Sequence, residues 1–363
     1  MVSFRPGENT IKPYVISGYP NEDITWEIAE QVNFGLEATF FNGLFETTVD
    51  IYQQIRHNVL DKRTVVPEAM GLGIQPLDNI GKVKSQGLDF SGKIQHAFSP
   101  DLWVILNGTL TYNKAVFEEI EEAADKPYYQ WRKGHDISQA VGYIAEGLFR
   151  DEQEIANSPV QGGDLMPGDI RYRDVNDDGV VDVEDAVHIG FPTTPRLIYG
   201  FNGFVNYKGL EFSFAFQGSG QRGFFINPAA MSPFANNHAL LTAIYKDHWS
   251  TDNMSERPLW PRLSTKNIIE HNPQEDASSD KETRMSTYFL RECRFLRCTS
   301  LELAYNLPKQ WSRKLALKNL KVFVRANNPF IISNFDLWDV ELGNNGFNYP
   351  IQKTYSVGLN VNF

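Results

Sequence analysis

One segment of the sequence has a spacing of oxygen-bearing residues that could bind a metal ion. Within residues 174–185, possible ligands fall at positions 1, 3, 5, 7, 9 and 12, and Gly179 stands at position 6. These ligands are Asp174, Asn176, Asp178, the Val180 carbonyl, Asp182 and Asp185. Calcium prefers six or more hard oxygens around a tight turn, so the segment predicts a structural Ca²⁺ site.

The last position of this segment departs from the usual calcium-loop pattern. Asp185 stands where such loops normally have Glu. The shorter side chain resembles that of dockerin-type loops, and it would weaken or reshape the site. The alternative interpretation is an acidic, solvated turn without a metal ion.

Aromatic side chains outside the alternating segments are candidates for ligand contact. A ring with an apolar body and a polar edge suits the face of a sugar. The candidates are Trp131, Trp249, Trp260 and Trp338, together with Tyr128 and Tyr129. The same residues could instead form an interfacial girdle or the hydrophobic interior of a loop.

The sequence lacks the motifs of the common enzyme classes. Its 7 histidines include no pair with zinc-ligand spacing, and no GxSxG, P-loop or GxGxxG-plus-helix motif occurs. Asp247 and His248, beside Trp249, could do acid–base chemistry, but we favour a simple loop contact. The sequence therefore predicts a protein that is not an enzyme.

β-Strands must position these candidates, because apolar and polar residues alternate along much of the chain. In residues 355–363 every second residue is apolar, and the residues between are small or polar. Residues 32–40 and 45–51 alternate in the same way around Asn42-Gly43, a strong hairpin signal. Pairing Phe40 with Phe45 keeps both apolar sets on one face.

A second hairpin follows the same rule. Residues 197–207 and 210–216 alternate around Lys208-Gly209, again with both apolar sets on one face. Further alternating segments are 88–94, 102–113, 301–305 and 322–324. The sequence thus predicts an all-β, antiparallel fold of about nine strands. Many of these have about ten residues, the length that a tilted membrane strand needs.

The predicted connections alternate between short and long. Short ones fall near 42–43, 97–101, 208–209 and 306–319, and long ones cover roughly 54–82, 117–195, 218–293 and 330–353. Transmembrane β-barrels of the outer membrane have short periplasmic turns and long extracellular loops. If Phe363 ends at the periplasmic rim, every long segment is extracellular, including 117–195 with its calcium-type loop at 174–185.

Composition and charge argue against other classes. A net charge of −11 and a pI of about 5.2 disfavour nucleic-acid binding. No apolar run is long enough for a transmembrane helix, and no signal peptide is visible after Met1. Bacterial single-chain barrels have even strand numbers, so we expect further strands and a targeting segment upstream of this chain.

Several stretches carry a resemblance to one family. They are Gly142–Phe149 (GYIAEGLF), Pro167–Asn176 (PGDIRYRDVN), Tyr207–Leu210, Phe216–Gly218, Phe289–Arg291, Phe295–Arg297, Leu301–Pro308 (LELAYNLP) and Leu320–Asn328 (LKVFVRANN). In this order they resemble motifs of the SusC/RagA-type TonB-dependent outer-membrane transporters of Bacteroidetes. Two departures are Asp177-Asp178-Gly179 in the calcium-type loop and Asn327-Asn328-Pro329 where the family has Gln-Asn-Leu.

The resemblance implies a function as well as a fold. Residues 1–363 would be the C-terminal β-barrel portion of a 22-stranded TonB-dependent receptor, without its plug domain. The complete protein would import glycan oligosaccharides or peptides, driven through TonB, which it would contact through the missing N-terminal part. A SusD-like surface lipoprotein would cover the barrel. Outer-membrane lipid would surround the barrel, and the protein would have no nucleic acid partner.

Two alternatives place the chain outside the membrane. One is a soluble all-β glycan-binding or scaffold protein with a dockerin-like calcium loop, and the other is a secreted β-rich hydrolase. The apolar side of the strands discriminates between them and a barrel. A soluble protein would bury that side, whereas a barrel presents it to lipid.

Overall fold

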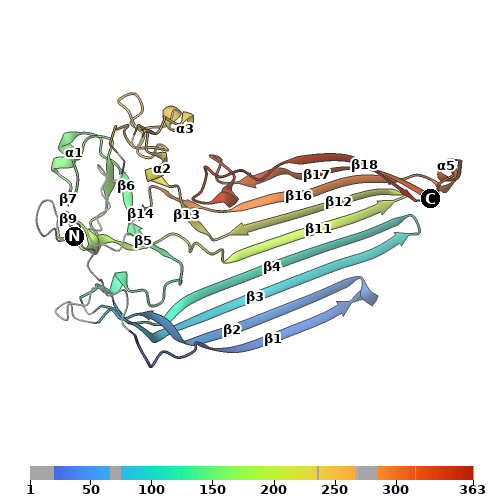
Figure 1. The fold of residues 1–363 in the computed structure, drawn as a ribbon, viewed down its shortest axis with the longest axis horizontal. Coiled ribbons are helices and arrows are strands. Elements are labelled where there is room, and N and C mark those ends of the chain that lie inside the picture. The colour runs from blue at the N-terminus through green and yellow to red at the C-terminus, as the bar shows by residue number, and fades with distance from the viewer. Residues whose placement is uncertain are drawn as a thin grey trace, which may run out of the picture.

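The computed structural model describes residues 20–65, 75–123, 125–234, 237–266, 268, 285–314 and 316–362. Its main element is an antiparallel sheet of nine strands in the order β1-β2-β3-β4-β11-β12-β16-β17-β18 (Figure 1). The strands are β1 (Ile28–Phe40), β2 (Phe45–Lys62), β3 (Leu77–Ser99), β4 (Leu102–Glu119), β11 (Leu197–Tyr207), β12 (Leu210–Gly220), β16 (Phe295–Asn306), β17 (Asn319–Ser333) and β18 (Thr354–Asn362). No helix in the described residues is long and apolar enough to cross a membrane.

Both predicted hairpins are present in the predicted register. Phe40 pairs with Phe45, and Tyr207 pairs with Leu210. The second turn places Lys208 at φ 50° and Gly209 at φ 86°, a left-handed pair that favours glycine. The turn chemistry and the alternation therefore specify the same pairing, and the predicted number of nine strands is confirmed.

Two strands extend well beyond their predicted ends. β2 continues to Lys62 and β3 begins at Leu77, whereas alternation was clear only over 45–51 and 88–94. The hydrogen-bonded ladder continues here through polar residues, interrupted by irregularities between Arg56 and Leu60. Apolar alternation ends where the apolar surface ends, but strand pairing does not depend on apolar side chains.

The two faces of the sheet differ in chemistry. On one side, which we call the apolar face, the register aligns Phe34, Ile51, Leu88, Tyr112 and Leu197 in one row across five strands. The opposite side, the polar face, aligns Glu37, Thr48, Ser91, Thr109 and Gly200. No described element covers the apolar face, and Phe34 there is 70% exposed and Val357 77%.

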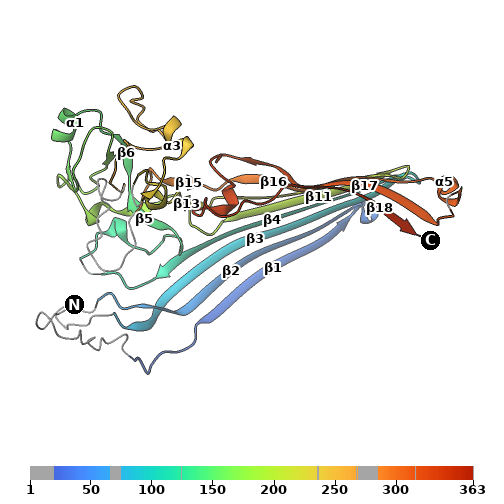
Figure 2. The same ribbon diagram turned by 45° about the horizontal axis from the view of Figure 1, so that its top comes forward.

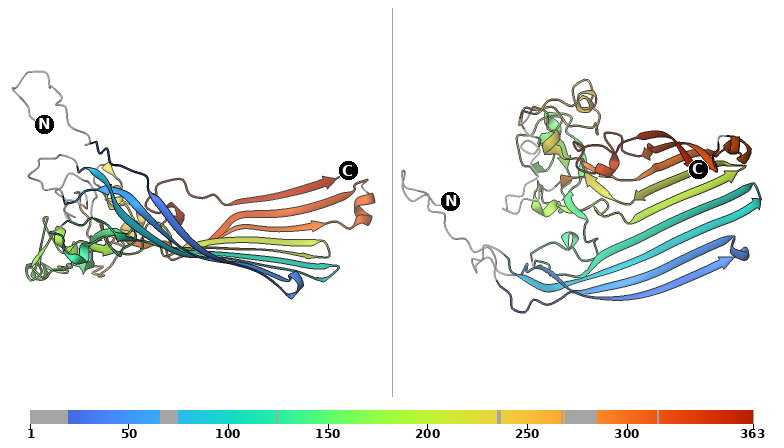
Figure 3. Two further views of the ribbon diagram at one scale, coloured as in Figure 1. Left: turned by 90° about the horizontal axis from the view of Figure 1, so that it is seen from below. Right: turned by 45° about the vertical axis from the view of Figure 1, so that its right-hand side comes forward.

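Short and long connections lie at opposite ends of this curved sheet (Figures 1 and 3). The turns after β1, β3 and β11 lie at one end, with the connection that contains α5 (Lys309–Lys314). At the other end the connections after β4, β12 and β17 fold together (Figure 2). We call the described residues of 120–196, 221–294 and 334–353 the loop body.

The loop body contains short elements in place of long helices or strands. Its strands are β5 (Ala140–Tyr143), β6 (Ala145–Leu148), β7 (Val160–Gln161), β8 (Ile170–Tyr172), β9 (Val180–Val181), β10 (Val187–Ile189), β13 (Gly223–Phe225), β14 (Met285–Ser286) and β15 (Leu290–Glu292). Its helices are α1 (Glu152–Ala156), α2 (Pro228–Met231) and α3 (Thr242–Lys246). β14 pairs with β5 across more than 140 residues of chain, so separate connections share one fold.

The hydrophobic core of the described chain lies mainly in the loop body. One cluster of buried residues joins all three connections. It comprises Tyr143, Leu148, Ile170, Tyr172, Ala186, Phe224, Ile226, Met231, Ile244, Trp260, Ile268, Tyr288, Phe289, Cys293, Phe295, Phe335 and Val340. The loop body is therefore a packed unit attached to one end of the sheet.

Candidate functional site

The polar face carries a groove across β1–β4, close to the short turn that joins β1 and β2. Its volume is about 600 Å³. Its lining residues are Glu37, Ala38, Thr39, Glu46, Thr47, Thr48, Ser91, Gly92, Lys93, Asn107, Gly108 and Thr109. Lys93 Nζ lies 3.5 Å from Glu46 Oε2, and Asn107 donates a 2.9 Å hydrogen bond to Asn202. The groove is thus hydrophilic, and its lysine lies close to one of its two glutamates.

A second polar network lies on the same face nearer the short turns. Lys321 Nζ is 2.5 Å from Glu211 Oε2 and 3.8 Å from Glu302 Oε1. Arg325 Nε donates to Glu302 at 2.6 Å, and Asn306 donates to Glu211 at 2.6 Å. The acidic residues of β12 and β16 face the basic residues of β17. This wall is therefore hydrophilic but carries no large electrostatic field of one sign.

A cavity of about 330 Å³ lies where the loop body meets the polar face. β1–β4 contribute Gln31, Tyr52, Gln54, Arg56, Ser85, Asn113 and Ala115, and the loop body and its junction with β11 contribute Asp136, Ile137, Ser138, Pro192, Thr194, Pro195 and Arg196. Arg196 Nε donates to Asp136 Oδ1 at 3.2 Å, which joins two segments of the loop-body wall. Asn113 Oδ1 is buried without a hydrogen-bond partner in the described structure, so it could accept from a polar solute.

The predicted calcium loop folds as a tight turn around its first side chain. Asp174 Oδ2 accepts from the Gly179 backbone N–H at 2.8 Å, and Gly179 has φ +88°. At the other end Asp185 is 0% exposed, and it accepts from the backbone N–H groups of Val175 at 2.6 Å and Asp182 at 2.8 Å. The first and last residues of the motif thus both hold the loop closed.

The fit of this loop to a metal ion is incomplete. Asp178 Oδ1 accepts from the Val180 N–H at 2.8 Å, and Asp182 Oδ1 accepts from the Glu184 N–H at 2.8 Å. Among the residues that the structure describes, no group of three or more His, Cys, Asp or Glu side chains could hold a metal ion as placed. A carboxylate retains further lone pairs when it accepts one hydrogen bond, so the chemistry of the donors remains suited to Ca²⁺.

Tyr129 connects the calcium-type loop to the rest of the loop body. Its hydroxyl donates to the Glu184 carbonyl at 2.9 Å. Partial burial raises the pKa of Tyr129, and the nearby carboxylates of Asp185 and Glu184 add to the effect. The neutral hydroxyl is therefore kept as a donor, and Tyr129 acts here as a structural residue.

The four tryptophans proposed as ligand contacts lie in different surroundings. Trp131 is 41% exposed and donates to the Lys126 carbonyl at 3.0 Å. Trp338 is partly buried against Phe335 and donates to the Gly343 carbonyl at 2.9 Å. Trp249 packs against the core beside Gly168, and its Nε1 is buried without a partner in the described chain. They do not converge on either cavity, and ligand contact by these three stays a prediction.

The prediction for Trp260 requires correction. This side chain is 1% exposed and packs at a 5.6 Å centroid distance from Phe289 in the core of the loop body. Neither ring face is available to a ligand. The alternative interpretation, that these aromatics form the interior of a loop, is the correct one at this position.

Asp247 and His248 make the local contacts expected of loop residues. Asp247 Oδ2 accepts from the Leu259 N–H at 2.9 Å. His248 Nδ1 lies 3.0 Å from the carbonyls of Ile244 and Tyr245 at the end of α3. Both side chains therefore have roles in fixing the backbone.

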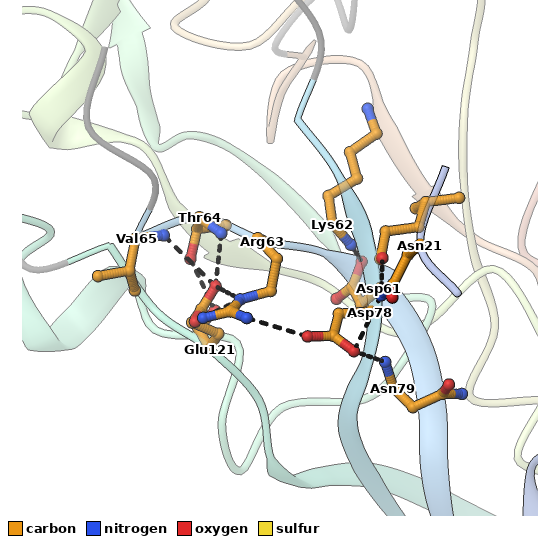
Figure 4. A network of polar contacts seen from close by, with 10 residues as sticks. Asn21, Asp61, Lys62, Arg63, Thr64, Val65, Asp78, Asn79 and Glu121 are labelled. Atoms are coloured by element: carbon orange, nitrogen blue, oxygen red, sulfur yellow. Dashed lines mark hydrogen bonds and ion pairs between the residues drawn. The ribbon is translucent and has the colours of Figure 1, made fainter. Parts of the chain in front are cut away.

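A polar network fastens the β2–β3 hairpin to the chain that follows β4 (Figure 4). Arg63 Nη1 lies 2.9 Å from Asp78 Oδ2, and Arg63 Nε lies 3.0 Å from Glu121 Oε1. The Thr64 N–H also donates to Glu121 at 2.7 Å. The hydrogen bonds from Arg63 to Asp78 and Glu121 raise the pKa of Arg63, and the bond to Asp78 has the larger effect. The extended parts of β2 and β3 are thus joined to the start of the loop body.

Sequence spacing did not reveal two further features, one inside the loop body and one where the loop body meets β16. His135 and His188 stack with ring centroids 3.7 Å apart and an interplanar angle of 11°. Arg297, 3% exposed, makes ion pairs with Asp339 at 2.5 Å and with Glu341. Each contact joins residues more than 40 positions apart, so only the folded structure brings them together.

Comparison with known proteins identifies the class. The family described as "TonB dependent receptor-like, beta-barrel" matches residues 2–252. The chain therefore belongs to the β-barrel domain family of TonB-dependent receptors, which are outer-membrane proteins.

The chain is also similar to individual members of this family. TonB-dependent receptor P26 of Formosa agariphila is 25% identical, over 94% of this chain and 35% of its own length. TonB-dependent receptor SusC of Bacteroides thetaiotaomicron is 24% identical, over 94% and 32%. The solved structure of the RagAB peptide transporter has a TM-score of 0.70 at 21% identity, over 96% and 36% of the two chains. The chain thus spans about a third of the length of these relatives.

Membership of this family indicates which environment each face of the sheet meets. In an outer-membrane barrel the apolar face meets lipid and the polar face meets the interior. The exposed Phe34 and Val357 are then lipid contacts, and the groove and cavity of the polar face line the interior. The soluble alternative is wrong, since that fold would bury the same apolar face.

Proposed function

We propose that this chain forms part of an importer that carries glycan oligosaccharides or peptides across the outer membrane, coupled to TonB. The observation that carries the proposal is the hydrophilic polar face, with its groove of about 600 Å³, beneath a packed loop body. A polar interior wall offers hydrogen bonds to a hydrated solute along its path. The chain itself has no catalytic role in this function.

The direction of the chain in the membrane follows from the same proposal. The loop body, with its calcium-type loop at 174–185, faces outside the cell, and the short turns face the periplasm. A SusD-like lipoprotein would dock on the loop body and deliver the solute. Likeness to the RagAB peptide transporter supports peptides as one substrate class, and glycan oligosaccharides are the other class that we propose.

Uptake by cells tests the function. The gene for the complete protein is deleted in its host, and uptake of two fluorescent libraries, one of oligosaccharides and one of peptides, is measured. We expect loss of uptake for one library, restored by the wild-type gene. Unchanged uptake of both libraries would refute the proposal. Affinity purification of the tagged complete protein is expected to recover a surface lipoprotein in about equal amount.

We further propose that residues 174–185 bind Ca²⁺ as a structural ion. The carboxylates of Asp174, Asp178, Asp182 and Asp185, the Asn176 side chain and the Val180 carbonyl would hold it. The support is the closed loop around Asp174, which already places these acidic groups on one turn. A bound cation would offset their mutual repulsion and order the loop.

Protection from protease tests calcium binding without any transport assay. In the complete purified protein, we expect a chelator to speed cleavage within 140–196 and added Ca²⁺ to reverse it. An Asp174→Asn/Asp182→Asn variant should behave in calcium as the wild type does in chelator. Asp164→Asn is the control, because the Asp164 side chain is 87% exposed and its ion-pair partner among the described residues is Lys266, outside the motif. Identical cleavage with and without Ca²⁺ would exclude the site.

A further inference from the structure

The apolar face ends abruptly on β3 and β4, at the end of the sheet that carries the loop body. On β4 the residues of this face are apolar or glycine from Leu102 to Tyr112, a span of 11 residues. That length matches one crossing of the membrane by a tilted strand. The next residue of the same face is Lys114, which is exposed.

Four hydrogen-bond donors gather just beyond this boundary. The register aligns Gln53 of β2, Gln86 of β3 and Lys114 of β4 in one row. Adjacent members of such a row are about 4.8 Å apart. Gln86 Nε2 donates to Gln53 Oε1 at 2.8 Å, which fixes both amides. Lys84 lies two residues further along β3 on the same face, opposite Val116.

The two lysines of this group differ from their neighbours in charge pairing. Lys82 lies 3.1 Å from Glu118 Oε2, and Lys93 on the polar face pairs with Glu46. Within the part of the chain that the structure describes, neither Lys84 nor Lys114 makes an ion pair. The acidic residue of this face in the row of Lys84 is Glu30, two strands away, where His57 lies 3.7 Å from it.

We propose that Lys84, Lys114, Gln86 and Gln53 form a binding site for the phosphorylated headgroup of a glycolipid in the outer leaflet. The site is continuous with the lipid-facing surface, at the depth where headgroups replace hydrocarbon. Unpaired ammonium groups attract lipid phosphate, and amides suit the sugar and acyl-amide groups around it. The inference rests on the proposed orientation, with the loop body outside.

Lipid binding by the complete purified protein tests this site. The probes are lipid A with its phosphate, the same lipid A after dephosphorylation, and inorganic phosphate as a competitor, and bound lipid is measured by native mass spectrometry. The test variant is Lys84→Gln/Lys114→Gln. The control is Lys93→Gln, on the same strand but on the opposite face.

The test variant should bind phosphorylated lipid A roughly tenfold more weakly, since each lysine near a charged lipid surface contributes measurably. The Lys93→Gln control should bind phosphorylated lipid A as tightly as the wild type does. The wild type should bind dephosphorylated lipid A only as weakly as the test variant binds the phosphorylated form. Equal binding by wild type and test variant, equal loss in the control, or full competition by millimolar phosphate would overturn the proposal. Solute uptake is measured in a separate experiment. A failure of the proposed import function can therefore be distinguished from a failure of the proposed lipid site.

Discussion

The nine-stranded sheet and the loop body place their apolar residues in opposite environments. On the sheet, Phe34 and Val357 point outward and are 70% and 77% exposed. In the loop body, Trp260 and Phe289 are each 1% exposed. One region is stabilised by strand pairing and a lipid surround, and the other by burial away from water, as in a soluble domain.

This contrast shows that two solvents act on one chain. The sheet needs lipid on its apolar face, because those side chains have no protein partner there. The loop body has water outside it and a hydrophobic interior. Arg297 of β16 makes ion pairs with Asp339 and Glu341, which fasten the loop body to the sheet. Each region should therefore respond to substitutions that leave the other unchanged.

The largest expected effect is loss of the loop-body core. Trp260→Ala should destabilise this unit by about 3–5 kcal/mol, because it removes a buried ring and leaves a cavity. Hydrogen exchange of the complete protein in detergent would show faster exchange in the loop body and unchanged exchange in β1–β4. Phe34→Ala is the control and should leave exchange in the loop body unchanged. Equal acceleration in the sheet would mean that the regions are not separate units.

A charge on the apolar face should have the next largest effect. Leu36→Arg places a cation at mid-span against lipid and should cost about 2–4 kcal/mol of barrel stability. Thr48→Arg tests the same depth on the polar face, since Thr48 pairs with Glu37, and it should be tolerated. Urea unfolding in lipid vesicles measures both variants. Equal destabilisation by the two would contradict the assignment of the faces.

The smallest expected effect is a pH dependence confined to the loop body. Burial lowers the pKa of His188, and the adjacent His135 lowers it further. The unfolded segment then binds protons more readily, so stability is complete above about pH 6.5 and falls as the pH drops below it. Protease cleavage within 120–196 should accelerate at pH 5.5 relative to pH 7.5, and His188→Gln should reduce that difference. A wild-type cleavage rate that is the same at both pH values would contradict the prediction.

The sequence predicted the sheet well because its physical signals are local. Asn42-Gly43 and Lys208-Gly209 specify turns, and alternation specifies which side chains share a face. The outer parts of β2 and β3 were missed because polar residues there occupy both faces. Strand pairing continues in that region without a periodic signal.

The loop body could not be predicted in the same way. Its core joins residues as distant as Tyr143 and Tyr288, and the Thr287 hydroxyl accepts from the Ala145 N–H at 2.9 Å. No spacing rule connects such positions. Trp260 illustrates the result, because an aromatic residue in a long connection looks the same in sequence whether it is buried or free to bind.

The pairing at the base of the longest connection has a consequence for evolution. The Asn113 N–H donates to the Arg196 carbonyl at 2.8 Å, so the returning chain joins β4, the strand from which the connection starts. A connection that starts and ends on two paired strands can be lengthened or replaced with little added closure entropy. Descendants of such a protein could exchange whole connections, and thereby acquire new cargo, while the wall beneath them stays the same.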